Sequence, residues 1–379
     1  MHRGALPPQD GGMPDRERWN DRAAAAEYAV LSRYVRRVGP LATARAAWPS
    51  RPGFAGIADA VGVWHYWWHA HLIDCAGDAA AHRPSRGRSR RIELLARAVG
   101  VRTGGRWVNR FYDDIAWMGV ALQRAAPTAF AGAVERIAAR LDRAIDPVIG
   151  ALPWHVGSEL FNAPANGPAA ILLARTGARA RAEGLAAWIE RTLDDPKTAL
   201  VRDGVVRGDV RDALYTYNQG VAIGASLALA SGAESTAGAS RHLDRAADLV
   251  ESVRRWCADD DLLPSAGGGD GGLFAGILCR YLAEAAVRLR TEPGRADAAA
   301  SARLLVLANA RALWDGRATI DGRPSFSADP RRCAVVPKEP RRPRAASGGA
   351  TDGDEHPDGD LSVQLSAWMT LEAAVAVTS

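Results

Sequence analysis

Apolar residues recur at spacings of three and four along nearly all of the chain, and alternation with a period of two is rare. This spacing places apolar side chains on one face of a helix. Breaker residues divide the pattern into about twelve segments, so the sequence predicts an all-α protein. The predicted helices span residues 21–36, 56–76, 89–99, 113–125, 128–144, 164–176, 179–193, 217–230, 238–256, 272–290, 296–314 and 361–377.

The predicted helices alternate in character along the chain. Every second helix, starting with 56–76, is apolar on nearly all sides, as in GVAIGASLALA at 220–230. The helices between them carry Arg and Glu on one face, as in RHLDRAADLVESVRRW at 241–256. A helix that is apolar all round is buried, whereas a helix with a charged face is half exposed. The alternation predicts an (α/α)6 barrel with six inner and six outer helices; an open solenoid fits the helix count but gathers polar residues less naturally.

A single catalytic domain is predicted over residues 21–379, because all twelve predicted helices belong to one barrel. Residues 1–20 are rich in Pro, Gly and polar side chains, and we expect a disordered tail there. The Gly-, Pro- and Asp-rich segment near 317–360 predicts a long loop in the last helical repeat.

The charge pattern argues against nucleic acid as a partner. The chain has a formal net charge of +5, but nearly all its cations are Arg residues that are interspersed with Asp and Glu. There is no apolar run long enough to span a membrane and no secretory signal at the start of the sequence. We therefore expect a monomer in the cytoplasm, or outside the cell if a leader is missing from this sequence.

Polar and aromatic residues gather where the inner helices begin. Five of the six predicted inner helices show such a cluster, namely WHYWWHAH at 64–71, NRFYDDIAWM at 109–118, NAPANGPAA at 162–170, YTYNQG at 215–220 and GGGDGGLFAG at 267–276. In a barrel of alternating helices these starts all face one end. Carboxylates, amides and aromatic faces are the groups that bind sugar hydroxyls and sugar C–H faces.

The adjacent carboxylates Asp113 and Asp114 are the candidate catalytic pair. Hydrolysis of a glycosidic bond uses one carboxylate as nucleophile or base and one carboxylic acid as proton donor. Neighbouring helical residues point about 100° apart, so the two side chains can reach different sides of one bond. One of the two Asp residues is equally well explained as the cap of the helix that follows, although capping needs only one.

The segment TGGRWVNRFYDDIAWMGVALQRA at 103–125 resembles the signature of glycoside hydrolase family 76, the bacterial and fungal α-1,6-mannanases. The resemblance extends from about residue 21 to 376. It includes YWWHAHLIDC (66–75), NAPANGPAAILLAR (162–175), YTYNQGVAIGA (215–225), DGGLFAGILCRYL (270–282) and LSVQLSAW (361–368).

The resemblance implies an (α/α)6 barrel and a retaining, cofactor-free endo-hydrolysis of α-1,6-mannan or mannooligosaccharides. It implies Asp113 as nucleophile and Asp114 as general acid/base. The candidates for sugar contacts, or for positioning the carboxylates, are Asn109, Tyr112, Trp117, Asn166, Tyr217, Gln219 and Asp270. The sequence departs from the family pattern at Ile115, where many members carry a polar residue, and it lacks the secretion signal expected for an enzyme that acts on external mannan.

Other functions remain open. A transglycosylase would share the covalent intermediate and transfer the sugar to another acceptor. A sugar epimerase on the same barrel would use histidines, for which His65, His69 and His155 are candidates, and a non-catalytic glycan-binding protein would not need paired carboxylates. His65, His69 and His71 have a spacing that can bind zinc, but no carboxylate lies between them, so packing is favoured and no metal is expected.

Overall fold

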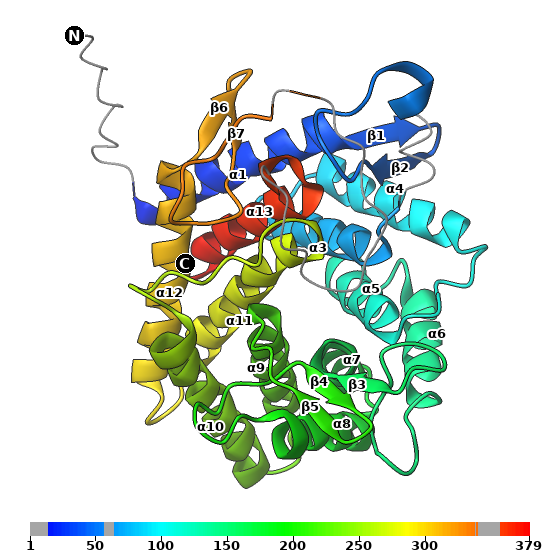
Figure 1. Ribbon diagram of the computed structural model, residues 1–379, viewed down its shortest axis with the longest axis vertical. Helices are drawn as coiled ribbons and strands as arrows, with labels where there is room; N and C mark the ends of the chain where they lie inside the picture. Colours follow the sequence, from blue (N-terminus) through cyan, green and yellow to red (C-terminus); the bar gives the residue numbers. More distant parts are fainter. Residues whose placement is uncertain (1–13, 57–63, 338, 340–356) are drawn as a thin grey trace.

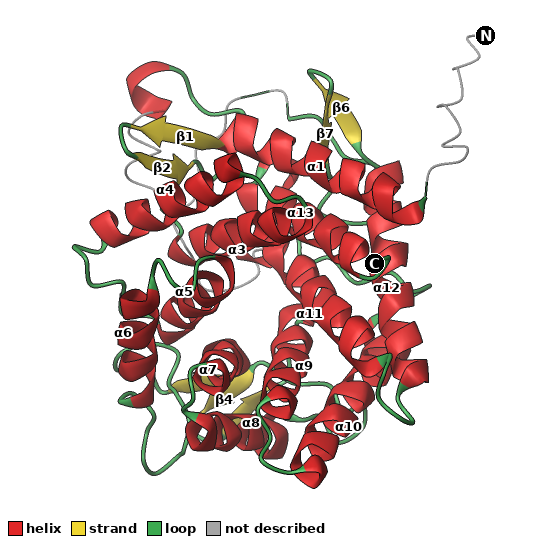
Figure 2. Cartoon of the chain, turned by 180° about the vertical axis from the view of Figure 1, so that it is seen from behind, coloured by secondary structure: helices red, strands yellow, loops and turns green. Residues whose placement is uncertain are grey.

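The computed structural model describes residues 14–56, 64–337, 339 and 357–379. Within these residues, twelve α-helices form two concentric rings (Figures 1 and 2). The inner ring consists of α3 (Tyr66–His82), α5 (Tyr112–Ala125), α7 (Ala163–Arg175), α9 (Thr216–Ser231), α11 (Phe274–Leu289) and α13 (Leu361–Ala376). The outer ring consists of α1 (Asp15–Tyr34), α4 (Arg86–Arg102), α6 (Ala131–Asp142), α8 (Arg179–Leu193), α10 (Thr236–Ser252) and α12 (Ala296–Asp315).

The inner helices close into a complete ring. Each packs against the next one along the chain, and α13 packs against α3. The predicted (α/α)6 barrel is therefore confirmed. Burial follows the predicted alternation, because almost every residue of α13 from Leu361 to Val375 is buried, whereas α10 buries only one face. The inner helices approach closely at small residues: a Cβ on Gly276 of α11 would lie 2.6 Å from the Cα of Ser366 on α13.

The largest differences between the predicted and the observed helix boundaries are in α3 and α1. The helix predicted at 56–76 is α3, which begins at Tyr66 and continues to His82; residues 57–63 lie outside the described part of the chain. Helix α1 begins at Asp15, so residues 15–20 are helical although the sequence analysis assigned them to the tail, of which 1–13 are not described. Acidic side chains in the first turn of α1 favour this earlier start, because they complement the helix dipole.

The predicted loop near 317–360 contains a short hairpin of β6 (Ala318–Ile320) and β7 (Arg323–Ser325). Residues 338 and 340–356 of this segment lie outside the described residues. Two other small antiparallel sheets join helices: β1 (Val35–Val38) pairs with β2 (Leu41–Ala44), and β3 (Leu160–Asn162), β4 (Gly204–Val206) and β5 (Asp209–Arg211) form a second sheet. Strands this short carry too few residues to show alternation, so the helical pattern concealed them.

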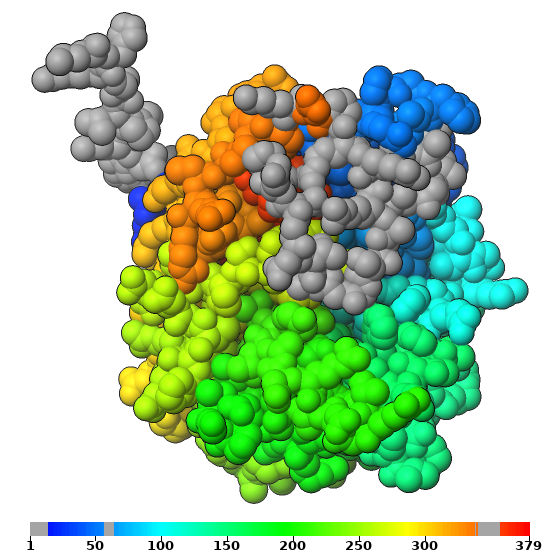
Figure 3. Space-filling model, viewed as in Figure 1, coloured from blue at the N-terminus to red at the C-terminus, as the bar shows by residue number. Residues whose placement is uncertain are grey.

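The sheet of β3, β4 and β5 lies where α7 and α9 begin. Leu160, Phe161 and Asn162 of β3 pair with Val206, Val205 and Gly204 of β4. The pairing joins the connection before α7 to the connection before α9. The green part of the chain, which includes this sheet, forms the lower part of the surface in this view (Figure 3). None of the described helices has the length and apolarity that a membrane crossing requires.

Buried ion pairs cross the barrel below the beginnings of the inner helices. Arg280 of α11 lies 2.9 Å from both Asp74 and Asp78 of α3, and it is 5% exposed. Arg124, near the end of α5, pairs with the same two carboxylates. These contacts tie three inner helices together inside the barrel, where a charge without a partner would be costly.

Candidate active site

Three carboxylates lie together at the end of the barrel where the inner helices begin. Asp113 and Asp114 occupy the first turn of α5, and Asp270 lies in the 3-10 turn Gly269–Leu273 that leads into α11. Burial is the main cause that raises the pKa of Asp113 to about 6 and that of Asp270 to about 6. Burial, together with the neighbouring charge of Asp113, raises the pKa of Asp114 well above its usual value. Carboxylates that hold protons near neutral pH are suited to acid and base catalysis.

Asp113 and Asp114 differ in their hydrogen bonds. Both oxygens of Asp113 accept: Oδ2 from the indole Nε1 of Trp154 at 2.8 Å, and Oδ1 from the backbone N–H of Asp114 at 2.7 Å. Asp114 receives a side-chain bond at Oδ2, from Nδ2 of Asn109 at 2.5 Å. Because hydrogen bonds to the charged form stabilise it, the contacts favour the anion at Asp113 and leave Asp114 as the better proton carrier.

Asp270 is held by two tryptophans of α3. Its Oδ1 accepts hydrogen bonds from Nε1 of Trp67 at 3.0 Å and from Nε1 of Trp68 at 2.8 Å. The negative charge of Asp270 raises the pKa of both Asp113 and Asp114. Asp270 was predicted as a sugar-binding residue within a Gly-rich stretch, and the structure brings it close to the catalytic candidates.

Tyr217 stands beside the carboxylates and stacks on Phe274, with ring centroids 4.0 Å apart. Burial, followed by the charges of Asp203, Asp113 and Asp270, raises the pKa of its hydroxyl well above the usual value. Tyr66 donates a hydrogen bond of 2.7 Å to the carbonyl of Trp107, and its pKa is raised by burial and by Asp114. The site therefore presents neutral phenols next to partly exposed carboxylates.

Two predicted contact residues lie deeper in the protein. The buried ring of Tyr112 contacts α6, where its hydroxyl accepts a hydrogen bond of 3.0 Å from Arg140. Trp117 is also buried, one helical turn below Asp113, and its ring centroid lies 4.6 Å from that of His71. Both residues support the helix that carries the carboxylates.

Asn166 and Gln219, the other two candidates, pin backbone segments. Asn166 exchanges two hydrogen bonds with the backbone of Leu152, at 2.7 and 2.9 Å. Gln219 does the same with Val201, at 2.7 and 2.8 Å. Each is the fourth residue of its inner helix and holds the connection that precedes the helix. Leu152 lies two residues before Trp154, so Asn166 positions the segment whose indole contacts Asp113.

The same device recurs at the fourth residue of two other inner helices. Gln364 of α13 exchanges two hydrogen bonds with the backbone of Phe326, at 3.1 and 2.8 Å. His69 of α3 accepts from the backbone N–H of Ala44 at 3.1 Å and from Trp64 at 3.0 Å. Buried polar side chains in this position satisfy the backbone groups of connections that enter the barrel.

The other two histidines of the spacing that can bind zinc, His65 and His71, are also buried. His65 stacks on Trp68 with ring centroids 3.9 Å apart, and burial lowers the pKa of His69 to about 4. Among the described residues, no group of three or more His, Cys, Asp or Glu side chains is arranged to hold a metal ion. These contacts favour the packing interpretation of the His65, His69 and His71 pattern.

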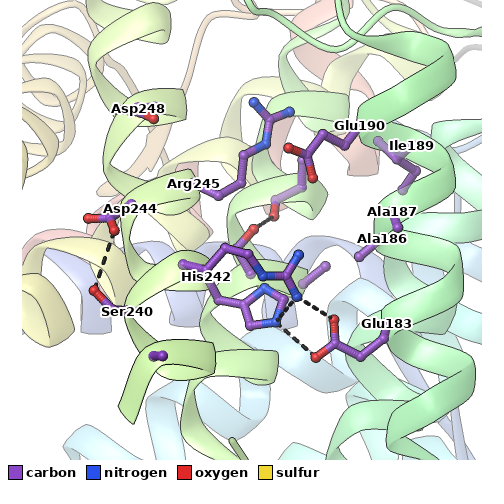
Figure 4. Close-up of a pocket in the computed structure, with 15 residues that line it drawn as sticks. Glu183, Ala186, Ala187, Ile189, Glu190, Ser240, His242, Asp244, Arg245 and Asp248 are labelled. Atoms are coloured by element: carbon purple, nitrogen blue, oxygen red, sulfur yellow. Dashed lines mark hydrogen bonds and ion pairs between the residues drawn. The ribbon is translucent and has the colours of Figure 1, made fainter. Parts of the chain in front are cut away.

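A separate hollow of about 630 Å³ lies on the outer wall, between α8 and α10 and over α9 (Figure 4). Its wall includes His242, which lies 2.9 Å from Glu183, and Arg245, which pairs with Asp194. None of the catalytic candidates lines this hollow. Several of its charged groups already have ion-pair partners. The carboxylates with strongly raised pKa values lie instead at the start of α5.

Sequence reasoning missed several residues of the site. Trp154 and Asp203 were not singled out in the sequence, and Trp67 and Trp68 were not assigned to the carboxylate cluster. Burial raises the pKa of Asp203, and its charge in turn acts on Tyr217. These residues lie in connections or on another helix, where periodicity gives no signal. The three tryptophans lie 41 to 203 residues away in the sequence from the carboxylates to which they donate.

Several solved structures resemble this chain. The GH76A alpha-1,6-mannanase from Salegentibacter sp. HEL1_6 is 24% identical and has a TM-score of 0.75, with 94% of this chain and 98% of that chain covered. An inactive double-aspartate variant of that mannanase, solved with alpha-1,6-mannotriose, gives 24% identity, coverage of 95% and 99%, and a TM-score of 0.76. The Lin0763 protein from Listeria innocua is 23% identical over 94% of this chain and 96% of its own, with a TM-score of 0.74.

No curated protein sequence matches the chain. Residues 65–318, in contrast, match the sequence model of glycosyl hydrolase family 76. The matched region covers well over half of the chain, and it contains the Asp113–Asp114 pair, Trp154 and Asp270. The barrel, the carboxylates and this match agree, and the chain belongs to glycosyl hydrolase family 76.

Proposed function

We propose that this protein is a retaining glycoside hydrolase that cleaves α-1,6-mannosidic bonds within mannan chains. The observation that carries the proposal is the unequal hydrogen bonding of two adjacent carboxylates, with both oxygens of Asp113 accepting and Asp114 more readily protonated. The mannanase relatives with the same fold support the substrate, because one of them was solved with alpha-1,6-mannotriose.

In the first step Asp113 acts as the nucleophile. Its carboxylate oxygen attacks the anomeric carbon, and a covalent glycosyl–enzyme forms as the glycosidic C–O bond breaks. Asp114 donates its proton to the departing oxygen. Trp154 stabilises the anionic form of Asp113 before the attack, and Asn109 holds the carboxyl of Asp114 in place.

In the second step Asp114 is an anion and acts as a base. It takes a proton from water, which attacks the anomeric carbon and releases Asp113 as a carboxylate. Two inversions at the same carbon leave the product in the α-configuration. Retaining enzymes place the two carboxyl groups about 5–5.5 Å apart, a spacing that neighbouring helical residues favour.

The first experiment measures oligosaccharide release from linear α-1,6-mannan and short α-1,6-mannosides by the wild type, Asp113→Asn and Asp114→Asn. We expect mannooligosaccharides from the wild type and losses of about 10²–10⁴ in either variant, with folding checked by circular dichroism. Proton NMR early in the reaction should show the α-anomer first. Initial release of the β-anomer, or an inert wild type, would contradict the proposal.

A transglycosylase is the second candidate, because it would use the same covalent intermediate. Adding a labelled α-1,6-mannobiose acceptor separates the two functions. A hydrolase releases free reducing ends in proportion to cleavage, whereas a transglycosylase produces longer labelled chains. An epimerase is less well supported, because His69, one of its candidate bases, is already an acceptor for Ala44 and Trp64.

A further inference from the structure

An exposed aromatic ring lies immediately before the catalytic pair. Phe111, the residue that precedes α5, is 38% exposed, although large apolar side chains are usually buried. Its ring centroid lies 5.5 Å from that of Trp154 and 5.4 Å from that of His155. The rings of Trp154 and His155 are themselves 5.1 Å apart. We call Phe111, Trp154 and His155 the aromatic step.

The aromatic step is held by backbone contacts on both sides. Phe111 and His155 form an antiparallel bridge, and the N–H of Tyr112 donates to the carbonyl of Trp154 at 2.9 Å. The N–H of Val156 donates to the carbonyl of Arg110, also at 2.9 Å. These contacts fix the connection before α7 against the start of α5. The backbone therefore holds the three rings in place.

The aromatic step and the two carboxylates share their supporting residues. Asn109 accepts from the backbone N–H of Phe111 at 2.9 Å and donates to Asp114 at 2.5 Å. Trp154 belongs to the step and also donates to Asp113. A sugar unit held at the carboxylates therefore lies beside a rigid aromatic surface, and the adjoining unit of the same chain is the group that can cover it.

The chemistry of the surface fits a pyranose. A flat ring binds the C–H face of a sugar, and the imidazole of His155 offers a polar edge for a hydroxyl. Val156, also 38% exposed, extends the apolar surface next to the step. Contact between a sugar and an aromatic ring does not depend on charge. The neighbouring Arg110 is exposed to solvent.

We propose that the aromatic step, with Phe111 as its exposed platform, binds a second mannose unit adjoining the one held at Asp113 and Asp114. This inference rests on the proposed function and assigns it a subsite that determines the preference for chain length. A disaccharide that is bound for cleavage without reaching the aromatic step gains no binding energy from it. Longer chains that reach the step do gain binding energy.

The test compares Phe111→Ala with Phe111→Trp, which keeps an aromatic surface. Val148→Ala is the matched control, because Val148 is 93% exposed on the connection that also carries Trp154 and His155. The value of kcat/KM is measured for α-1,6-linked mannooligosaccharides from two to six units. We expect Phe111→Ala to lose about tenfold on the longer chains and much less on the shortest cleaved one. Phe111→Trp and Val148→Ala should follow the wild type.

A binding measurement separates this inference from the proposed function. Saturation-transfer NMR with α-1,6-mannotetraose reports contact with the step whether or not the chain is cleaved. If the wild type cleaves mannan and Phe111→Ala loses equally on all lengths, the subsite is wrong while the function stands. If nothing is cleaved, the subsite is still supported when mannotetraose binding is lost in Phe111→Ala and kept in Phe111→Trp. The subsite is overturned if Phe111→Ala binds mannotetraose as well as the wild type does, or if the wild type does not bind it.

Discussion

The indole of Trp154 donates a hydrogen bond of 2.8 Å to Oδ2 of Asp113, although 41 residues separate them in the sequence. The bond lowers the pKa of Asp113, which burial nonetheless raises to about 6. It joins the connection before α7 to the first turn of α5. Asn166 of α7 holds the same connection two residues earlier, at Leu152. A side chain of α7 thus helps to position the indole that stabilises the anion of Asp113 on α5.

Replacing Trp154 with Phe should raise the pKa of Asp113 further. The aromatic ring remains, but the donor that favours the anion is lost, and hydrogen bonds to charged groups contribute roughly 1.5–3 kcal/mol. We expect the acidic limb of the kcat/KM profile to move upward by about one pH unit. Trp256→Phe, at an exposed position remote from α5 in the sequence, serves as the control and should leave the profile unchanged. An unmoved acidic limb in Trp154→Phe would remove Asp113 as the group that titrates there.

Replacing Asp270 with Asn should shift the same limb in the opposite direction. The charge of Asp270 raises the pKa of both Asp113 and Asp114, and the amide oxygen of Asn can still accept from Trp67 and Trp68. We expect the acidic limb to fall by about half a pH unit. The pH dependence of kcat/KM measures this directly. An unmoved acidic limb would show that the charge of Asp270 does not act on the pair, and a shift to higher pH would contradict the expectation.

The proposed catalytic carboxylates should lower the stability of the fold at neutral pH. The folded pKa of Asp113 is about 6 against an unperturbed 3.8, so the fold favours the protonated form. The cost is absent below about pH 4 and complete above about pH 6. Asp113→Asn should therefore raise Tm by about 2–6 °C at pH 7, with the gain vanishing near pH 4. Asp209→Asn, on exposed β5, is the control. An equal gain in the Tm of Asp113→Asn at pH 7 and pH 4 would contradict the expectation.

Asn166 and Gln219 should behave as structural residues. Changing either to Ala leaves the buried backbone N–H and C=O of Leu152 or Val201 without partners, at a cost of about 1–3 kcal/mol for each unpaired group. Urea unfolding should show this loss. For Gln219→Ala, KM should change little at a temperature where the variant is fully folded. A large rise in KM without loss of stability would instead make Gln219 a sugar contact.

The buried arginine inside the barrel should be critical for folding. Arg280→Met removes one of the two arginines that pair with Asp74 and Asp78 and leaves Arg124 as the other. Breaking a buried ion pair from one side costs about 3–5 kcal/mol. Arg181→Met breaks the exposed pair with Asp142 and should cost less than about 1 kcal/mol. Chemical unfolding of the two variants gives the comparison. Similar costs would mean that the buried network adds little to the barrel.

The fold was largely predictable because burial leaves a local trace in the sequence. Segments that are apolar all round became α9 and α13 of the inner ring, and segments with one charged face became outer helices such as α10. Predicted boundaries were least accurate where aromatic and polar residues obscured the pattern, as at the start of α3. The three small sheets were missed because strands of three or four residues carry no measurable period.

The sequence by itself determined the alternation of helices and the place of Asp113 and Asp114 in the first turn of an inner helix. Tertiary structure alone decided which side chains surround them. Trp67 and Trp68 reach Asp270 across more than 200 residues. Asn166 and Gln219, candidates for sugar contact or for positioning the carboxylates, form hydrogen bonds with the backbone of Leu152 and Val201. Helical periodicity arises from contacts within one or two turns, so a sequence displays it. Hydrogen bonds between distant segments exist only after the rings have packed, and no local pattern records them.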